Sequence, residues 1–339
     1  MKDKGNPNEI NLESPGALFA EIMKRLPLVC PWPLMLGADD ILMYRRAWVR
    51  KISYVFFEIP KKNGGTRQIL APKGILKYIL KTINSILRDL WVPMDFVHGF
   101  APGRSVVTGA APHVGAPYVF HMDIKDFFTS IKAVHVYMAL VYELGLNRVT
   151  AWIISELCTY PAGGSDVYLP QGSPASPILS NIVFAAMDRS LKGLADCFGL
   201  TYTRYADDIT FSGPYNAFRE GGSFRTCLDR MISEEGFSVN PAKTRLQKRG
   251  GRQEVTGLTV CEKVNVPRKW LKGLRAQIHR MEVGGCTPRD LASAWGKIAW
   301  LRQVRGGSDP CSRKLVARLC VLEVGLYNAG LDDEDETKD

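Results

Sequence analysis

The sequence predicts an α+β fold in which an antiparallel sheet carries acidic residues and helices lie behind it. Residues 200–205 and 209–212 are rich in Thr, Tyr and other β-branched or aromatic side chains, and a short acidic segment separates them. Two such runs are typical of a β-hairpin. Residues 74–90 and the segment after residue 267 instead repeat apolar side chains at helical spacing. The chain therefore combines a paired sheet with amphipathic helices.

The hairpin would raise two adjacent carboxylates, Asp207 and Asp208, to its tip. Neighbouring unpaired acids repel each other, and a divalent cation such as magnesium removes that cost because it prefers hard oxygen ligands. The alternative is ordinary turn chemistry, since Asp is common in turns. The rest of the chain must decide between a metal site and a simple turn.

The first 54 residues are expected to form a helical extension. Leu18, Ile22 and Leu26 recur at helical spacing, and the segment Pro31-Trp32-Pro33 interrupts the pattern.

A basic hairpin follows this extension. Residues 53–59 and 66–71 have the composition of strands, and a turn with two lysines and two glycines joins them. Glycine permits close approach to a phosphate, and lysine supplies positive charge. Basic turns are also common on protein surfaces, so this motif alone does not assign a function.

A second acidic position lies at the end of a buried strand. Residues 118–122 are predicted to form this strand, which ends at Asp123 and leads to a helix over about 132–145. A carboxylate in such a place is costly unless it is paired or binds a metal. Asp126 fits better as a turn or helix-capping residue.

The remaining elements follow from local patterns. Ser173 and Pro174 indicate the start of a helix. Further helices are predicted over about 175–196, 217–235, 267–282, 288–301 and 312–328, with a single strand over 253–260.

The helix predicted over 267–282 has an apolar face and a basic remainder. The apolar face consists of Trp270, Leu274, Ile278 and Met281. The basic residues include Arg268, Lys269, Lys272 and Arg275. Such a helix suits a lid over a nucleic-acid groove, and a solvated surface helix is an equally open alternative.

Composition favours a polyanionic partner. The 339 residues carry a formal charge of +10, and nucleic acid is the foremost partner for such a chain. The eight Cys form no Cys-x-x-Cys pair, which argues against a zinc ribbon or a disulfide framework and favours a cytoplasmic protein. No apolar run approaches ~18 residues, so no membrane span is expected. Residues 331–339 are expected to be a disordered acidic tail.

The two acidic positions together suggest an enzyme. Three carboxylates on one sheet edge can hold two magnesium ions for in-line phosphoryl transfer. Three segments resemble motifs of the reverse transcriptases: Phe120–Phe128, Gln171–Asn181 and Tyr205–Asp208. The resemblance implies a right-hand polymerase fold, with fingers over 55–117, a palm over 118–260 and a helical thumb over 261–330.

The resemblance also implies roles for single residues. The two magnesium ions would be held by Asp123, Asp207, Asp208 and the backbone carbonyl of Ile124. The incoming deoxynucleotide (dNTP) would contact Lys61, Lys62, Arg67, Gln171 and Gly172. The ring of Phe128 would exclude a 2′-hydroxyl, and Lys243 would be a general acid beside the leaving pyrophosphate. Tyr205 and Ala206 would lie near the primer terminus.

Within that family the chain resembles the bacterial retron enzymes. The resemblance rests on two segments. Val255–Gly257 is similar to the retron signature, and Val266–Lys269 is similar to the start of the thumb. The residues expected to bind nucleic acid are therefore Val255, Thr256, Gly257, Arg268, Lys269, Lys272 and Arg275. One departure is the segment Gly109–His113, which lacks the Asn of the retron Asn-Ala-x-x-His motif, so that His113 is more simply a loop histidine.

The retron resemblance implies a structured noncoding RNA and DNA synthesis from an internal 2′-hydroxyl of that RNA. The product would be a branched RNA–DNA hybrid (msDNA), and an effector (toxin) protein would be a partner in anti-phage defence. Two alternatives stay open: a reverse transcriptase of abortive-infection or diversity-generating type, and a non-catalytic RNA-binding scaffold. The intact acids argue against a scaffold. The sequence assigns no oligomeric state.

Overall fold

The computed structural model describes residues 10, 12–31, 36–61 and 64–335. The chain divides into two compact units. The first unit comprises the residues up to Gly103, Phe120–Phe211 and Asn216–Arg245. The second comprises Arg104–Val119, Ser212–Tyr215 and the residues from Leu246 onward.

The first unit begins with the predicted helical extension. Helix α1 spans Pro15–Val29, where the Ser14 hydroxyl accepts a hydrogen bond from the Ala17 amide and caps the first turn. Its buried face includes Leu18, Ile22 and Leu26, so the spacing correctly indicated the helix. Two short helices follow within the predicted extension, α2 (Ala38–Met43) and α3 (Ala47–Ile52), whose separate bounds the sequence did not give.

The predicted basic hairpin and the helix after it are confirmed. Strands β1 (Tyr54–Pro60) and β2 (Thr66–Pro72) pair antiparallel, with Ile59 opposite Arg67. Helix α4 spans Gly74–Leu90 and packs against α1. Seven of its side chains are buried, as its amphipathic pattern requires.

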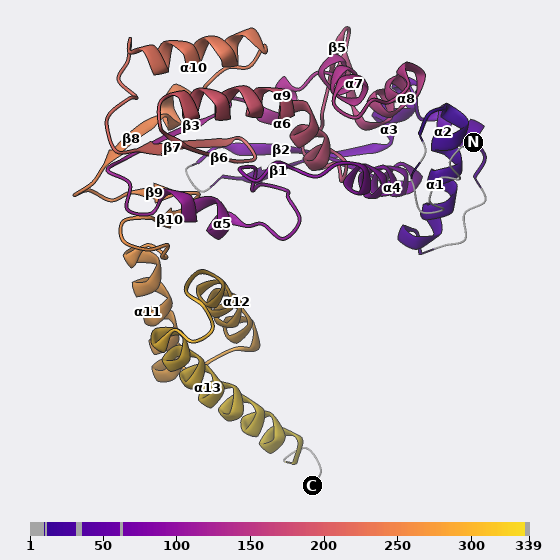
Figure 1. The fold of residues 1–339 in the computed structure, drawn as a ribbon. Helices are drawn as coiled ribbons and strands as arrows, with labels where there is room; N and C mark the ends of the chain where they lie inside the picture. Colours follow the sequence, from indigo (N-terminus) through magenta and orange to yellow (C-terminus); the bar gives the residue numbers. More distant parts are fainter. Residues whose placement is uncertain (1–9, 11, 32–35, 62–63, 336–339) are drawn as a thin grey trace, which may run out of the picture. The chain divides into compact units, whose positions relative to one another are not determined.

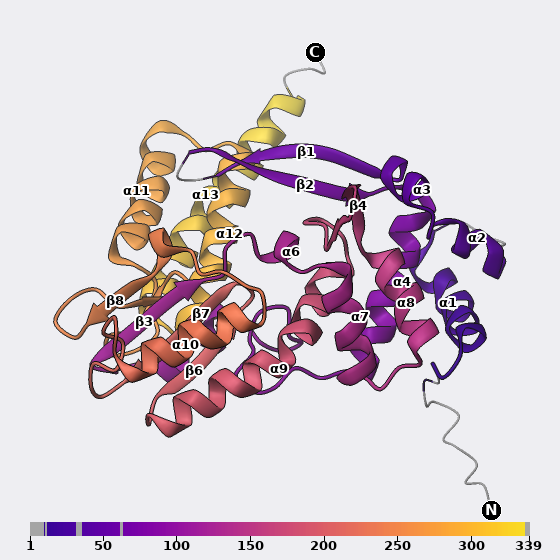
Figure 2. The same ribbon diagram turned by 90° about the horizontal axis from the view of Figure 1, so that it is seen from above.

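A four-stranded sheet in the order β6-β7-β3-β8 carries the acidic positions. Its strands are β3 (Tyr118–Asp123), β6 (Thr201–Tyr205), β7 (Asp208–Gly213) and β8 (Arg245–Lys248). The strand ending at Asp123 and the hairpin over residues 200–212 were both predicted, and both are confirmed. The turn consists of Ala206 and Asp207, whereas Asp208, expected at the tip, is the first residue of β7. Helices α9 (Ser176–Cys197) and α10 (Ser223–Glu234) lie on one face of this sheet (Figures 1 and 2).

Helix α10 begins six residues later than predicted, because a turn closed by the Gly222 amide and the Arg219 carbonyl precedes it.

The remaining elements of the first unit are short. They are α6 (Phe127–Ser130), α7 (Ala133–Tyr142), α8 (Arg148–Cys158), β4 (Tyr160–Gly163), β5 (Asp166–Tyr168) and the 3-10 turn η2 (Pro241–Lys243).

The second unit corrects one sequence prediction. Residues 253–260 do not form one strand but two short ones, β9 (Glu254–Val255) and β10 (Leu258–Thr259), which pair antiparallel. The chain reverses because Thr256 and Gly257 both have positive φ angles, +49° and +82°. A β-branched residue rarely adopts this conformation, so local composition favoured a continuous strand.

Three helices complete the second unit, together with α5 (Val106–Ala110) and η1 (Ala111–His113). They are α11 (Arg268–Gly284), α12 (Pro288–Arg305) and α13 (Pro310–Asp335). All three were predicted, and their buried faces, which include Leu274, Ile298 and Leu319, share one apolar cluster.

Disorder was expected from residue 331, but α13 continues to Asp335, since each residue added to a formed helix gains a backbone hydrogen bond. Residues 336–339 lie outside the described residues. Among the described helices, none is both long and apolar enough to cross a membrane.

Candidate active site

The end of β3 meets the turn between β6 and β7. The Ile124 amide donates a hydrogen bond of 3.1 Å to the Asp207 carbonyl, and this bond joins the two acidic segments directly. Asp123 and the Asp207–Asp208 pair, far apart in sequence, therefore lie at the same end of the two central strands of the sheet. Ile124, expected to offer a carbonyl to a metal, lies between them and is 1% exposed.

Asp123 is paired with a lysine from a third segment. Its side chain is almost buried, and Lys243 Nζ lies 2.7 Å from one carboxylate oxygen and 2.9 Å from the other. The Asn240 amide donates to the Asp123 carbonyl at 2.8 Å, which fixes the turn η2 that presents Lys243. Burial lowers the pKa of Lys243, but the hydrogen bond and charge of Asp123 outweigh it, so the pKa is raised.

Asp208 has a neighbour that sequence reasoning missed. His121 Nε2 lies 3.1 Å from Asp208 Oδ1, and His121 Nδ1 lies 3.1 Å from the Thr210 hydroxyl. His121 is two residues before Asp123 on β3, so strand alternation places both side chains on the same face of the sheet. That alternation was the signal that could have found it.

Asp207 experiences the charge repulsion within this group of acids. Burial, followed by the negative charges of Asp123 and Asp208, raises the pKa of Asp207 from its ordinary 3.8 to about 6. The direction of this pKa shift is that expected for a buried carboxyl with two other carboxylates nearby.

The donor set suits magnesium, because carboxylate oxygens are hard ligands that carry excess negative charge at this end of the sheet. As they stand, no three His, Cys, Asp or Glu side chains among the described residues are grouped so that they could hold a metal ion. Lys243 contacts both oxygens of Asp123, and His121 contacts Asp208. The Lys243 side chain is 57% exposed, so it has room to withdraw from Asp123.

Comparisons with known proteins agree with this geometry. The family model described as reverse transcriptase (RNA-dependent DNA polymerase) matches residues 59–260. The retron Ec86 reverse transcriptase of Escherichia coli is 31% identical over 284 residues, which cover 84% of each chain. The chain belongs to the bacterial retron reverse transcriptases.

Two Myxococcus xanthus relatives are longer. The retron Mx65 reverse transcriptase is 41% identical over 239 residues, which cover 67% of this chain and 56% of that protein. The retron Mx162 reverse transcriptase is 35% identical over 301 residues, which cover 80% of this chain and 61% of that protein. The chain therefore spans less than two thirds of these two retron enzymes.

The loop expected to receive the dNTP packs directly on β2. The Leu70 amide donates to the Gln171 carbonyl at 2.8 Å. Gly172 has a φ of +126°, and a Cβ there would lie 2.8 Å from the Leu70 carbonyl oxygen. Only glycine fits so close an approach. The structure thus joins Gln171 and Gly172 to the hairpin that carries Arg67.

Phe128 lies five residues after Asp123, on the short helix α6. Its ring packs against Phe127 and Phe100, with centroids 5.2 and 6.2 Å away. The left-handed conformation of Asp126, with φ of +49°, turns the chain into α6. The ring is therefore held by aromatic neighbours and remains partly exposed.

Lys61 and Arg67 are exposed on the β1–β2 hairpin, and the Lys61 amide donates to the Gly65 carbonyl at 3.0 Å. Lys62, also expected to bind the triphosphate, lies outside the described residues.

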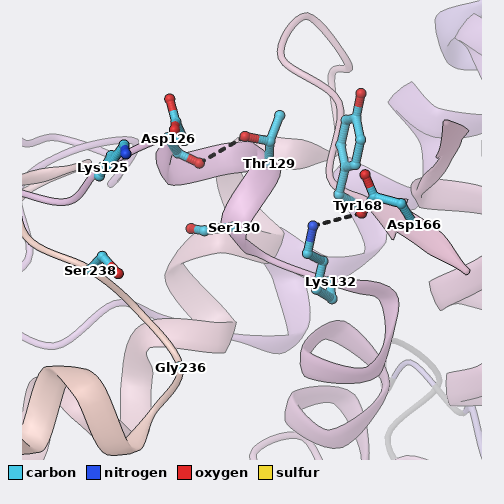
Figure 3. Close-up of a pocket in the computed structure, with 9 residues that line it drawn as sticks. All are labelled: Lys125, Asp126, Thr129, Ser130, Lys132, Asp166, Tyr168, Gly236 and Ser238. Atoms are coloured by element: carbon cyan, nitrogen blue, oxygen red, sulfur yellow. Dashed lines mark hydrogen bonds and ion pairs between the residues drawn. The ribbon is translucent and has the colours of Figure 1, made fainter.

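A polar pocket of about 390 Å³ begins two residues beyond Asp123 and contains Lys125, Ser130 and Lys132 (Figure 3). Lys132 points toward Asp166, with Nζ 2.7 Å from its carboxylate.

The residues expected to bind nucleic acid in the second unit differ in exposure. Val255 is fully buried in the apolar cluster, and Thr256 donates its hydroxyl to the Val106 carbonyl at 3.2 Å. Gly257 forms the turn between β9 and β10. Four basic residues of α11 are exposed: Arg268, Lys269, Lys272 and Arg275.

His113 is a structural residue rather than a loop histidine. It is buried in η1, and its Nδ1 lies 2.7 Å from the Ser212 hydroxyl.

Proposed function

We propose that this chain is an RNA-directed DNA polymerase of the retron type. One observation carries the proposal. Asp123 and the Asp207–Asp208 turn lie together at one end of the sheet, within the segment that matches the reverse transcriptase family. The protein would bind a structured noncoding RNA and extend DNA from a 2′-hydroxyl of that RNA to give branched msDNA. We further propose that it acts with an effector protein in anti-phage defence.

Asp123, Asp207 and Asp208 would hold two magnesium ions, which would activate the attacking hydroxyl and neutralise the leaving pyrophosphate. The protein itself positions the reactants. Gln171 and Gly172 would form the wall of the nucleotide site, because β2 fixes their backbone. Phe128 would crowd a ribose 2′-hydroxyl and so favour dNTPs.

Lys243 would exchange partners during the reaction. A lysine ammonium group is protonated at neutral pH, so Lys243 could offer both charge and a proton to the pyrophosphate once it leaves Asp123. The exposed lysines and arginines of α11 would supply salt-dependent affinity for the RNA backbone.

Primer extension tests the polymerase proposal. Purified protein is given a primed RNA template, dNTPs and MgCl₂, and Asp208→Asn is compared with Asp229→Asn, which alters an exposed acid of α10. DNA synthesis should be abolished by the first change and kept with the second. Full synthesis by Asp208→Asn would contradict the assignment of the metal-binding acids.

A second experiment tests the retron product. The gene is expressed with its flanking DNA, and nucleic acid that copurifies with the protein is treated with an enzyme that cleaves 2′–5′ linkages. Release of a DNA strand from RNA supports branched msDNA. Unbranched or protein-primed DNA would instead indicate a reverse transcriptase of another prokaryotic type.

A further inference from the structure

The turn that carries Asp207 and Asp208 has an unusual backbone. Ala206, its first residue, has a φ of +57°, which places a non-glycine residue in the left-handed region. Such a conformation persists only where the surroundings enforce it. Ala206 is 7% exposed, so those surroundings are protein.

A fully buried arginine holds the turn from within the first unit. Arg204 Nη1 donates to the Ala206 carbonyl at 3.0 Å. The same guanidinium donates to both carboxylate oxygens of Asp188 on α9, at 2.8 and 2.6 Å. The Tyr202 hydroxyl donates to Asp188 at 2.6 Å and completes the cluster. Arg204 and Asp188 are both 0% exposed.

Gly99 supports the same turn from another segment. A Cβ on Gly99 would lie 2.3 Å from the Ala206 amide nitrogen and 2.9 Å from the Tyr205 carbonyl carbon. The segment is tied to β6, because the His98 amide donates to the Arg204 carbonyl at 2.8 Å. The Asn181 side-chain amide, on α9, donates to the Gly99 carbonyl at 2.9 Å. The backbone at Gly99 is thus in direct contact with the turn, and there is no room for a side chain on residue 99.

We propose that the Arg204–Asp188 pair and Gly99 are positioning residues that set the geometry of the metal-binding turn. Arg204 fixes the carbonyl of Ala206, and Gly99 allows the supporting segment to lie against its amide. Helix α9 provides the rigid base, since both Asp188 and Asn181 project from it. The inference rests on the proposed polymerase function, because the geometry matters through the acids of that turn.

The Arg204–Asp188 pair and Gly99 differ from the residues that contact the carboxylates of the turn directly. Lys243 and His121 contact the carboxylates, whereas Arg204 and Gly99 meet the turn at its backbone. Residues that orient metal ligands in this way typically change metal affinity or activity by about 10- to 100-fold when altered.

The first test is Gly99→Ala, compared with Gly193→Ala. Gly193 lies on α9 with nothing within 4 Å of the position that a Cβ would take, so this control adds the same methyl group without contact. Three quantities are measured on the full chain: the melting temperature, the affinity for Mn²⁺ by electron paramagnetic resonance, and primer extension with Mg²⁺. Gly99→Ala should weaken Mn²⁺ binding by about 10- to 100-fold and slow extension at saturating dNTP, with the KM for dNTP little changed.

The second test avoids leaving a buried charge unpaired. The double variant Asp188→Asn with Arg204→Gln removes both buried charges together, so that neither is left without a partner of opposite charge. The shorter side chain at position 204 cannot also reach the Ala206 carbonyl. We expect a melting temperature close to that of the wild type, and the same losses of Mn²⁺ affinity and rate.

The outcomes separate the two proposals. If the wild type fails to extend a primer, the polymerase proposal falls, and the positioning role falls with it. If the wild type is active and either folded variant binds Mn²⁺ and extends primers as well as the wild type, the positioning role is wrong. A loss of activity that matches only the fraction of unfolded protein would show a merely structural role.

Discussion

Asp207→Asn should stabilise the protein when no metal is present. The folded state raises the pKa of Asp207 from 3.8 to about 6, through burial and the neighbouring charges of Asp123 and Asp208. Because the folded state disfavours the charged form, stability is lost as pH rises from about 4 through 6. At 1.36 kcal/mol per pKa unit, the cost above pH 7 is at most about 3 kcal/mol, and Asn removes it.

Thermal unfolding in EDTA measures this gain. At pH 7.5 the variant should melt several degrees above the wild type, since about 1 kcal/mol shifts the melting temperature of a domain this size by roughly 2–4 °C. At pH 5 the wild-type carboxyl is mostly protonated in the fold, so the difference should shrink by about half. Magnesium should reverse the order, because ligand binding stabilises the wild type more.

Asp229→Asn is the matched control, since Asp229 is exposed on α10 and pairs with Arg225 one helical turn away. It should change the melting temperature little at either pH. A variant Asp207→Asn that melts at or below the wild-type temperature at pH 7.5 in EDTA would refute the reasoning, because it would show that the acids do not repel one another.

Three further predictions concern other residues. Phe128→Ala should raise incorporation of ribonucleotides relative to dNTPs, because it removes the ring that we propose crowds the 2′-hydroxyl; the ratio of kcat/KM values for the two substrates measures this, and an unchanged ratio contradicts it. Gly172→Ala should lower the melting temperature and weaken dNTP binding, because its Cβ would press on the Leu70 carbonyl; Gly193→Ala, in open space, should do neither. Asp188→Ala should destabilise the fold by about 3–5 kcal/mol, because it leaves the Arg204 charge buried and unpaired; urea unfolding tests this, and a loss below about 1 kcal/mol would show that the charge finds solvent.

The sequence by itself determined the local elements and the chemistry of the acids. Apolar, aromatic and β-branched composition indicated the strand ending at Asp123 and the hairpin at Asp207, and helical spacing gave α4 at its observed bounds. These features depend on neighbours within a few residues, so one-dimensional periodicity suffices to find them. The resemblance to reverse transcriptases rested on the same short segments.

Only the tertiary structure decided which groups meet. The pairing of Lys243 with Asp123, the hydrogen bond between His121 and Asp208 and the support of Ala206 by Arg204 join residues that local patterns do not connect. Periodicity reports which face of an element is buried but not which distant side chain faces it there. The left-handed residues Ala206 and Thr256 were likewise hidden from the sequence, because non-glycine residues adopt that backbone only when packing and hydrogen bonds from elsewhere in the chain enforce it.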